Sequence, residues 1–264
     1  MDATTPWHSN GSRPRDRQFV TALARGLELL RCFTPDDGVL GNQQLAERTR
    51  LPKATVSRLT HTLRELGYLH YSERLGKYHL APPVLSLGYA CLHNMDIRHR
   101  ARELMQQLAN EAGASVAMGA RDRLEMVYVE HSHAPNLRTL RLDIGSRIPL
   151  ATTSLGRALL AGLPEAERDY LLTHIRERDP AQWPAIEAGI QAAVAEINQR
   201  GFCLVKGEWQ RDVHAVGVPL VPRDGAEIVA LNCGGPEFSL PLEKLEQEIG
   251  PRLVHLARTL EAGT

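Results

Sequence analysis

One run of the sequence, residues 42–69, constrains the fold more than any other. Apolar positions at helical spacing predict a helix over Asn42–Arg48 and a second helix directly after it, with the short turn "TRLP" between them. Asn42 is the expected N-cap of the first helix, because its side chain can accept a backbone N–H. Pro52 suits the start of the second helix and Gly67 suits its end. The run therefore predicts a helix-turn-helix.

The residues around this run extend the pattern. An additional helix is expected over Phe19–Phe33, where four apolar residues repeat at helical spacing: Val20, Leu23, Leu27 and Leu30. After Gly67, the segment "YLHYSERLGKYHL" predicts two short strands around the turn Leu75-Gly76. The order helix, helix, turn, helix and hairpin predicts a winged helix-turn-helix over residues 18–81, a module that binds DNA.

The second helix of the run has two chemically different sides. At 100° per residue the apolar side collects Val56, Leu59, Leu63 and Leu66, which we expect to face the core. The N-terminal residues of such a helix usually reach base edges in the major groove. Ser57 and Arg58 are therefore the candidates for base contacts, Ala54 could meet a thymine methyl, and His61 shares their side.

Basic and hydroxyl residues at the edges of this helix are expected to hold DNA phosphates. The candidates are Lys53, Thr55 and Arg64 on the helix, with Arg74 and Lys77 at the hairpin tip. Taken alone, the polar side could be a solvated helix face. Within the whole motif, the alternative to DNA binding is a winged module that binds protein.

The rest of the chain alternates strand and helix patterns. The segment "APPVLSLG" marks a boundary, and a connecting helix is expected from there to Glu111. Strands are expected at Ala114–Gly119, Met126–Glu130, Leu137–Leu142, Phe202–Val205, Val216–Val221 and Ile228–Asn232. Helices are expected at Leu155–Ala161, Glu165–Leu172, Ala185–Arg200 and Leu242–Leu260, with Pro251 kinking or splitting the last. The predicted class is α+β, with an antiparallel sheet flanked by helices.

Composition limits the remaining possibilities. The chain has 264 residues, enough for two domains, and 43% of them are hydrophobic. Residues 1–80 hold 12 Lys and Arg against 8 Asp and Glu, whereas residues 81–264 hold 19 Lys and Arg against 23 Asp and Glu. A polyanion is therefore expected to bind the basic N-terminal part, residues 1–80. The absence of an apolar stretch of about 18 residues and of a signal peptide predicts cytoplasmic residence and no membrane partner. Residues 1–17 are expected to be a disordered tail.

Cysteine and histidine spacing predicts no metal site and no cofactor. Four scattered cysteines without a C-x-x-C pair are expected to be isolated, mostly buried thiols: Cys32, Cys91, Cys203 and Cys233. His131 and His133 have the spacing of a ligand pair, but no acidic or Cys partner follows at a useful distance. We therefore expect surface histidines there.

Several blocks in this order make the chain resemble the IclR family of bacterial transcriptional regulators. They are "VTALARGLELLRCF", "NQQLAERTRLPKATVSRLTHTLRELGYL", "YHLAPPVLSLG", "DIGSRIPLATTSLGRALLAGLP", "INQRGF" and "VGVPLVPRDGAEIVALNCGGP", and the front half also resembles the subgroup that controls aromatic-acid breakdown. The resemblance implies a winged domain (18–81), a linker helix (82–95) and a GAF-like effector domain (96–264). It also implies a homodimer or homotetramer on a palindromic double-stranded promoter site.

A small organic acid is the expected effector. Thr152, Thr153 and Ser154 precede the helix that starts at Leu155, and their hydroxyls with the free N–H groups of the helix start could hold a carboxylate. All four residues are candidates for effector contact. Simple capping is the alternative. The resemblance implies that the segments "EWQRDVHAVG" and "LNCGGP" line the same cavity. Their candidates for effector contact are Trp209, Arg211, Asp212, His214, Asn232 and Cys233, and rim residues without ligand contact are the alternative.

The predicted function is a ligand-responsive transcriptional regulator that senses a small carboxylic acid, with aromatic acids among the candidates, and controls a catabolic promoter. An enzyme with an added DNA-binding domain is the less favoured alternative, because the sequence has no G-x-S-x-G and no Walker A motif. The sequence leaves the effector, the operator and the regulatory sign open.

Overall fold

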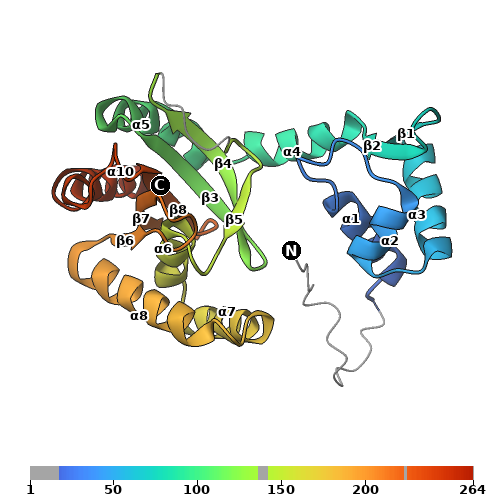
Figure 1. The fold of residues 1–264 in the computed structure, drawn as a ribbon. Coiled ribbons are helices and arrows are strands. Elements are labelled where there is room, and N and C mark those ends of the chain that lie inside the picture. Colours follow the sequence, from blue (N-terminus) through green and yellow to red (C-terminus); the bar gives the residue numbers. More distant parts are fainter. Residues whose placement is uncertain (1–17, 136–141, 223–224, 264) are drawn as a thin grey trace. The chain divides into compact units, whose positions relative to one another are not determined.

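The computed structural model describes residues 18–135, 142–222 and 225–263 (Figure 1). The chain divides into two compact units between Asn94 and Met95. In the described residues, no helix has the length and apolar character needed to cross a membrane. Each unit has its own apolar core.

The first unit contains helices, a hairpin and a final exposed helix. Its elements are α1 (Thr21–Arg31), α2 (Asn42–Thr49), α3 (Lys53–Glu65), β1 (Leu69–Ser72), β2 (Lys77–Leu80) and α4 (Pro83–His93). The hairpin is antiparallel, and Leu69 pairs with Leu80. A core of fully or nearly fully buried apolar side chains joins the helices to the hairpin: Leu29, Leu40, Leu45, Ala46, Val56, Leu63 and Leu69. The predicted order of a winged helix-turn-helix is confirmed.

Two details of this unit differ from the prediction. Asn42 is not the N-cap of α2, because Gly41 has the extended backbone of that position and the Gly41 N–H donates to Gln44 Oε1 at 3.0 Å. A third short stretch also joins the hairpin, since Leu40 and Tyr78 exchange two backbone hydrogen bonds of 2.9 and 2.8 Å. A single paired residue leaves no alternating pattern for the sequence to reveal.

The second unit is built on one six-stranded antiparallel sheet with the order β5-β4-β3-β8-β7-β6. The strands are β3 (Ser115–Asp122), β4 (Glu125–His133), β5 (Arg147–Pro149), β6 (Cys203–Lys206), β7 (Val213–Leu220) and β8 (Val229–Pro236). Strands β3 and β8 are the two central strands, and Gly234 of β8 lies opposite both Ser115 of β3 and Ala215 of β7. The predicted α+β class with an antiparallel sheet is confirmed.

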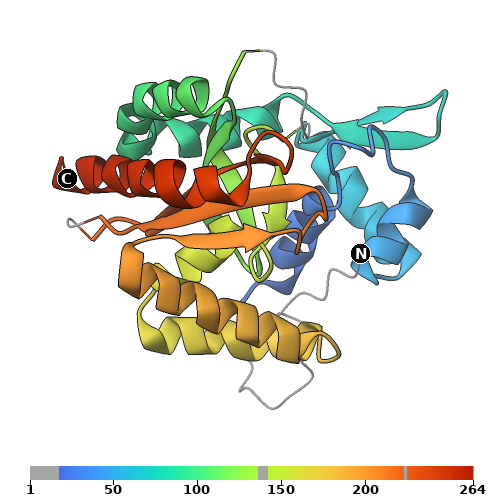
Figure 2. The ribbon, with the colours of Figure 1, turned by 60° about the vertical axis from the view of Figure 1, so that its left-hand side comes forward.

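Helices cover both faces of this sheet (Figures 1 and 2). α5 (Asp96–Ala112) and α10 (Gly250–Ala262) lie on one face, and α6 (Ser154–Gly162) lies on the other, backed by α7 (Glu165–Arg178) and α8 (Trp183–Arg200). The side of α6 toward the sheet is apolar, and its Leu155, Ala158 and Leu159 are fully or almost fully buried. This burial fixes α6 against β7.

The end of the chain is divided just before Pro251, as expected. A short α-helix, α9 (Leu242–Lys244), leads into a π-helical turn over Leu245–Ile249, and α10 starts at Gly250. Proline has no N–H to donate to the carbonyl four residues earlier, so regular α-helix cannot run through this point unbroken. The expected strand Leu137–Leu142 lies, except for Leu142, outside the described residues.

Candidate functional site

The polar side of α3 is open to solvent, and its apolar side forms the core of the first unit. Val56 is fully buried and Leu63 nearly so. Leu66 was predicted to face the core with them, but it is 62% exposed. Leu66 is the C-cap, where the helix ends and the chain turns toward β1, so helical spacing no longer fixes its direction. The exposed residues on the other side are Lys53, Ala54, Ser57, Arg58 and His61.

Helix α2 holds α3 in place through polar contacts at their crossing. The Asn42 amide donates to Ser57 Oγ at 3.3 Å. The buried Thr60 hydroxyl donates to the Val56 carbonyl at 3.0 Å and lies 3.4 Å from Asn42 Oδ1. Asn42 thus orients α3 instead of capping its own helix, and Ser57 keeps one side of its hydroxyl toward solvent.

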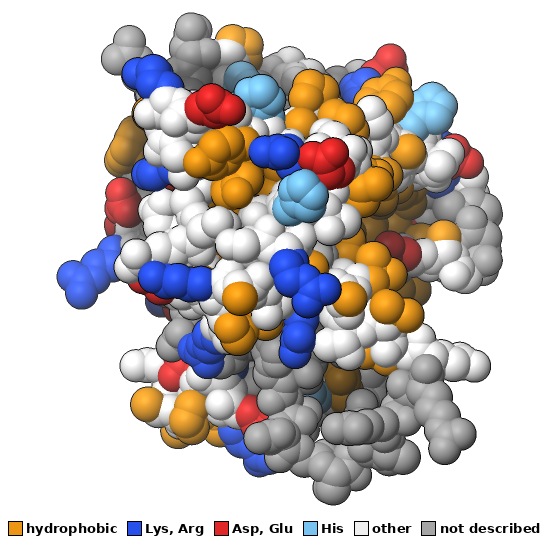
Figure 3. Space-filling view, turned by 90° about the vertical axis from the view of Figure 1, so that its right-hand side faces the viewer, with side chains coloured by type: hydrophobic (Ala, Val, Ile, Leu, Met, Phe, Trp, Pro, Cys, Tyr) orange, Lys and Arg blue, Asp and Glu red, His pale blue; other side chains and the backbone are white. Residues whose placement is uncertain are grey.

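The remaining DNA-contact candidates lie around this exposed helix. Arg64 is exposed and pairs with Glu65 at 3.2 Å, Arg74 is exposed at the hairpin tip, and Thr55 and Lys77 are half-buried. Figure 3 shows Lys and Arg side chains gathered across the middle of the face that it presents, with Asp and Glu toward its edges and upper part. An exposed helix with cations beside it has the shape and charge to enter a DNA major groove.

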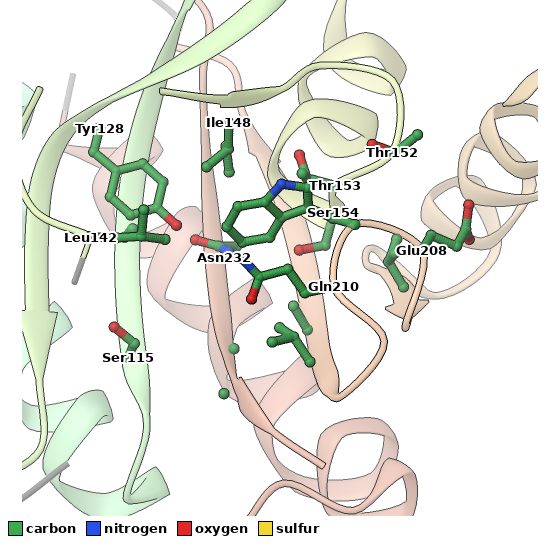
Figure 4. A pocket seen from close by; sticks show the side chains of 17 residues that line it. Ser115, Tyr128, Leu142, Ile148, Thr152, Thr153, Ser154, Glu208, Gln210 and Asn232 are labelled. Atoms are coloured by element: carbon green, nitrogen blue, oxygen red, sulfur yellow. The ribbon is translucent and has the colours of Figure 1, made fainter. Parts of the chain in front are cut away.

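A cavity opens in the second unit between the sheet and the start of α6 (Figure 4). Its walls come from all six strands of the sheet, from Ser154 at the start of α6 and from three loops. Most of the lining is apolar or small, and the polar groups are few: Ser115, Tyr128, Thr152, Thr153, Ser154, Glu208, Gln210 and Asn232. Apolar walls with a few convergent polar groups are typical of small-molecule sites.

The N-terminus of α6 forms one end of the cavity. Thr153 is its N-cap, and the Thr153 hydroxyl accepts from Gly156 N at 3.1 Å and donates to the Pro149 carbonyl at 2.7 Å. Capping therefore accounts for Thr153. The first backbone bond of the helix runs from Arg157 N to Thr153 O, so the Ser154 and Leu155 amides precede it and have no intrahelical partner.

Glycine at position 217 allows α6 to approach the sheet this closely. A Cβ on Gly217 would lie 2.2 Å from the Ser154 carbonyl oxygen. A Cβ on Gly156 would lie 2.0 Å from the Leu150 carbonyl oxygen on the other side. The helix start is thus wedged between β7 and the loop after β5, which places Ser154 at the cavity.

Two buried polar atoms in the cavity wall have no hydrogen-bond partner among the described residues. They are Ser154 Oγ and Asn232 Oδ1. Ser154 is 2% exposed and Asn232 is 9% exposed. Figure 4 shows both side chains pointing into the cavity. Leaving a buried polar atom unpaired costs about 1–3 kcal/mol, so both atoms favour a polar ligand between them.

Tyr128 lies beside Asn232 at the end of the cavity away from Thr152 (Figure 4). Burial raises the pKa of the Tyr128 hydroxyl to about 12, although a hydrogen bond from Asn232 acts in the opposite direction. Tyr128 therefore keeps its proton at neutral pH.

An ion pair between the buried Arg157 and the exposed Glu208 ties a loop of the cavity wall to α6. Arg157 is buried on α6, and its guanidinium binds both carboxylate oxygens of Glu208, one of them at 2.7 Å, and also the Ala151 carbonyl at 3.0 Å. Among the described lining residues Glu208 is the one with a formal charge, and Arg157 compensates it. Trp209, the next residue, packs against the apolar core of the second unit.

Half of the residues predicted to contact an effector line this cavity. Thr152, Thr153, Ser154, Trp209 and Asn232 do so, and the other five do not: Leu155, Arg211, Asp212, His214 and Cys233. His214 and Cys233 alternate with lining residues on β7 and β8, so they point to the opposite face of the sheet. His214 there contacts the Leu240 carbonyl through Nδ1 at 3.3 Å.

The other three predicted effector-contact residues lie outside the cavity lining for different reasons. Leu155 is fully buried in the core beneath α6. Arg211 and Asp212 are exposed on the loop before β7, where the Asp212 carbonyl accepts from Glu237 N at 2.8 Å. Two loop residues cannot be assigned to a face by period-two alternation, which holds only within a strand.

Sequence reasoning missed part of the cavity wall. Ser115 and Ala117 on β3, Tyr128 on β4 and Ile148 on β5 all line it. Alternation along β3 and β4 could have grouped the first three on one face. β5 is three residues long, too short for a recognisable pattern.

The H-x-H pair does not form a metal site with other described residues, since no group of three or more candidate ligands occurs among them. His131 is half-buried and hydrogen-bonded through Nε2 to the Ser115 hydroxyl at 2.5 Å, whereas His133 is exposed. Burial lowers the pKa of the His131 imidazole, against the attraction of Asp143 and Glu130. Of the four cysteines, Cys203 and Cys233 are buried, Cys32 is half-buried and Cys91 is exposed, and all are free thiols.

Comparison with known proteins gives the family. The model for the IclR helix-turn-helix domain matches residues 22–73, and the model for the IclR C-terminal domain of bacterial transcriptional regulators matches residues 89–262. The HTH-type transcriptional regulator TsaQ1/TsaQ2 of Comamonas testosteroni is 36% identical over 246 residues, which cover 92% of this chain and 88% of that protein.

Solved structures agree. The crystal structure of an IclR family transcriptional regulator from Brucella abortus matches with a TM-score of 0.90 and 53% identity, covering 96% of each chain. An IclR homologue from Microbacterium hydrocarbonoxydans, solved with 4-hydroxybenzoate, has the same fold at a TM-score of 0.68 and 19% identity, over 92% of this chain and 100% of that one. This chain belongs to the IclR family of bacterial transcriptional regulators.

Proposed function

We propose that this regulator binds a small aromatic carboxylic acid in the cavity of its second unit and that the bound acid changes its affinity for a catabolic promoter. The observation that carries the proposal is the pair of unpartnered buried atoms, Ser154 Oγ and Asn232 Oδ1, in an otherwise apolar cavity of the described chain. The amides at the α6 N-terminus and the hydroxyl groups beside them favour an anion. The 4-hydroxybenzoate complex of a distant homologue with this fold supports an aromatic acid.

The DNA partner is a double-stranded promoter site, read by α3. Arg58 is exposed and has the five-donor guanidinium that can bind guanine O6 and N7 together. Ser57, Ala54 and His61 share the exposed side and complete the proposed base contacts. Proposed phosphate contacts come from Lys53, Thr55, Arg64, Arg74 and Lys77.

A homo-oligomer with at least two such helices would match a palindromic site. The first unit has a large apolar surface that is open in the single chain. In α4 no residue is buried, and Leu85, Leu87 and Tyr89 are 75%, 58% and 65% exposed. Exposed apolar surface of this extent favours association with a second copy. As a regulator of bacterial DNA, the protein would act in the cytoplasm.

The experiment is a band shift with the DNA upstream of the protein's own gene, titrated with salt and with aromatic acids. Specific retardation should weaken steeply as salt rises, because Lys and Arg release counterions from phosphates. An aromatic acid should change the midpoint of the shift at constant salt. Failure to retard any DNA at low salt would favour a winged module that binds protein instead.

A further inference from the structure

The cavity between the sheet and α6 is small for an aromatic acid. Its volume is about 60 Å³. An apolar cavity that holds one benzene ring in another protein measures about 150 Å³, and a carboxylate group needs additional space. An acid of the size of benzoate therefore fits only if part of the cavity wall moves outward.

The strands and the helix in this wall are fixed by their neighbours. Each of the four inner strands of the sheet is paired on both sides, so moving one of them breaks backbone hydrogen bonds. The start of α6 has no room to shift, because Gly217 and Gly156 leave no space for even a Cβ against the neighbouring carbonyl groups.

Two of the three loops in the wall are bonded to the elements beside them. In the loop before α6, the Thr153 hydroxyl donates to the Pro149 carbonyl at 2.7 Å. In the loop before β5, Gly145 N donates to the Tyr128 carbonyl at 2.8 Å, and Tyr128 N donates to the Ser146 carbonyl at 3.0 Å. Movement of either loop disturbs the helix cap or strand β4.

The third loop, between β6 and β7, is held mainly by bonds at its own base. Gly207 N donates to the Val213 carbonyl at 2.9 Å, and Val213 N donates to the Gln210 carbonyl at 3.0 Å. Three residues of this loop line the cavity: Glu208, Trp209 and Gln210. A rearrangement beyond the base of the loop leaves the hydrogen bonds of the sheet intact.

Trp209 lies between two anchored points of this loop. Glu208 is anchored by its ion pair with the buried Arg157, and the Asp212 carbonyl accepts from Glu237 N at 2.8 Å. The Trp209 side chain is half-buried and packs against the core of the second unit. It is the largest side chain of the cavity lining, so its withdrawal enlarges the cavity more than that of any other described lining residue.

We propose that Trp209 is a plug of the cavity: its indole takes up space that an acid needs, and it moves outward with residues 210 and 211 when the acid binds. This inference rests on the proposed acid-binding function and makes Trp209 a competitor of the ligand. A tryptophan that stacks on the bound ring would have the opposite effect and strengthen binding. A plug lowers the apparent affinity in proportion to the fraction of molecules that are open.

The test measures the affinity of the full-length protein for benzoate and 4-hydroxybenzoate by isothermal titration calorimetry. A plug predicts that affinity rises as the side chain becomes smaller, so Trp209→Phe should bind more tightly than wild type and Trp209→Ala at least about fivefold more tightly. Trp183→Phe is the matched control, because Trp183 packs against the same core outside the cavity lining, and its affinity should equal that of wild type. A folded Trp209→Ala protein that binds both acids no more tightly than wild type would overturn the plug.

A second measurement follows Trp209 in a chain that keeps it. The sequence has three tryptophans, so the double variant Trp7→Phe, Trp183→Phe leaves Trp209 as its one tryptophan. Saturating benzoate should shift the Trp209 emission to longer wavelength and increase its quenching by acrylamide, because the indole moves into water. Unchanged or reduced quenching would overturn the plug even if the Trp209 variants do not fold.

Failure of the plug and failure of the proposed function give different results. A wild-type protein that binds an acid without these changes keeps the effector site and excludes the plug. Absence of binding to every acid by wild type and Trp209→Ala alike, in protein that still retards its upstream DNA, would overturn the proposed effector class and this inference with it.

Discussion

Arg58 and Lys53 are both exposed on α3, but their side chains are expected to serve different parts of the DNA. Arg58→Ala should reduce binding to the specific promoter fragment by about 1–3 kcal/mol and leave random DNA nearly unaffected. Lys53→Ala should weaken binding to both DNAs by the same factor. It should also reduce the slope of the salt dependence by about the amount that corresponds to one phosphate contact. Fluorescence anisotropy with both DNAs measures the difference. Equal losses on both DNAs for Arg58→Ala would refute its assignment as a base contact.

His131 should make the protein less stable in mild acid. Burial lowers its pKa in the folded state, so the unfolded chain binds the proton more readily. Its stabilising contribution is complete above the ordinary His pKa of about 6.5 and is lost as the pH falls through that value toward the lower folded pKa.

The comparison of wild type with His131→Gln isolates this contribution from the other groups that titrate. Asp143 and Glu130 oppose the shift and His133 adds to it, and all three remain in the variant. Urea unfolding at pH 7.5 and 5.5 should show a smaller loss of unfolding free energy in the variant. A loss equal to or larger than that of wild type would contradict the predicted direction of the pH dependence.

Among the secondary-structure elements, the position of α6 depends on glycine in the neighbouring strand. Gly217→Ala would place a methyl group 2.2 Å from the Ser154 carbonyl oxygen, so α6 or β7 must move. We expect a loss of about 1–3 kcal/mol in unfolding free energy and weaker binding of acids. Gly26→Ala in α1 is the control, because no described atom lies within 4 Å of the added methyl. Thermal unfolding measures the stability of both variants. A Gly217→Ala protein as stable as wild type would show that α6 and β7 move apart at no cost and would contradict this prediction.

The elements themselves were predictable where apolar spacing is regular. α3 and the strands β3, β4, β6 and β8 follow such spacing, and each was predicted near its observed position. β5 and the pairing of Leu40 were missed, because three residues or one residue cannot display a period. Helix α7 extends six residues beyond the predicted Leu172, since Ile175 continues its buried side.

The cavity was predictable only in part for a related reason. The hydroxyl run at Thr152, Thr153 and Ser154 stands next to a helix start and identified one end. The other end joins Tyr128 and Asn232, which are 104 positions apart and meet only because β8 inserts beside β3. Sheet order of this kind is a property of the tertiary structure, which a single sequence does not reveal.

For the whole molecule, the apolar surface of α4 gives a prediction about assembly. Leu87→Glu would place a carboxylate in the surface that we propose meets a second copy, so association should weaken by at least about tenfold. Analytical ultracentrifugation should then show a smaller species at concentrations where wild type is associated. Leu75→Glu is the matched control, an exposed leucine at the hairpin tip. If both variants keep the wild-type mass, α4 is not part of the interface.

Within the second unit, strand β4 connects the cavity to α5, the first helix of that unit. Tyr128 lines the cavity, and the carbonyl of the next residue, Val129, accepts from Arg98 Nε at 2.8 Å. Arg98 is buried in the first turn of α5 and also pairs with Glu130 at 3.0 Å. The strand that lines the cavity is therefore hydrogen-bonded to the first turn of α5 one residue beyond Tyr128.

The most direct test of regulation is the affinity for upstream DNA, measured by anisotropy at one salt concentration with and without a saturating hydroxybenzoate. Calorimetry under the same conditions establishes that the acid is bound. We predict a change of at least about fivefold in DNA affinity, in either direction, because a regulator must couple its two sites by roughly 1 kcal/mol or more. An unchanged affinity with the acid bound would contradict regulation by this ligand class.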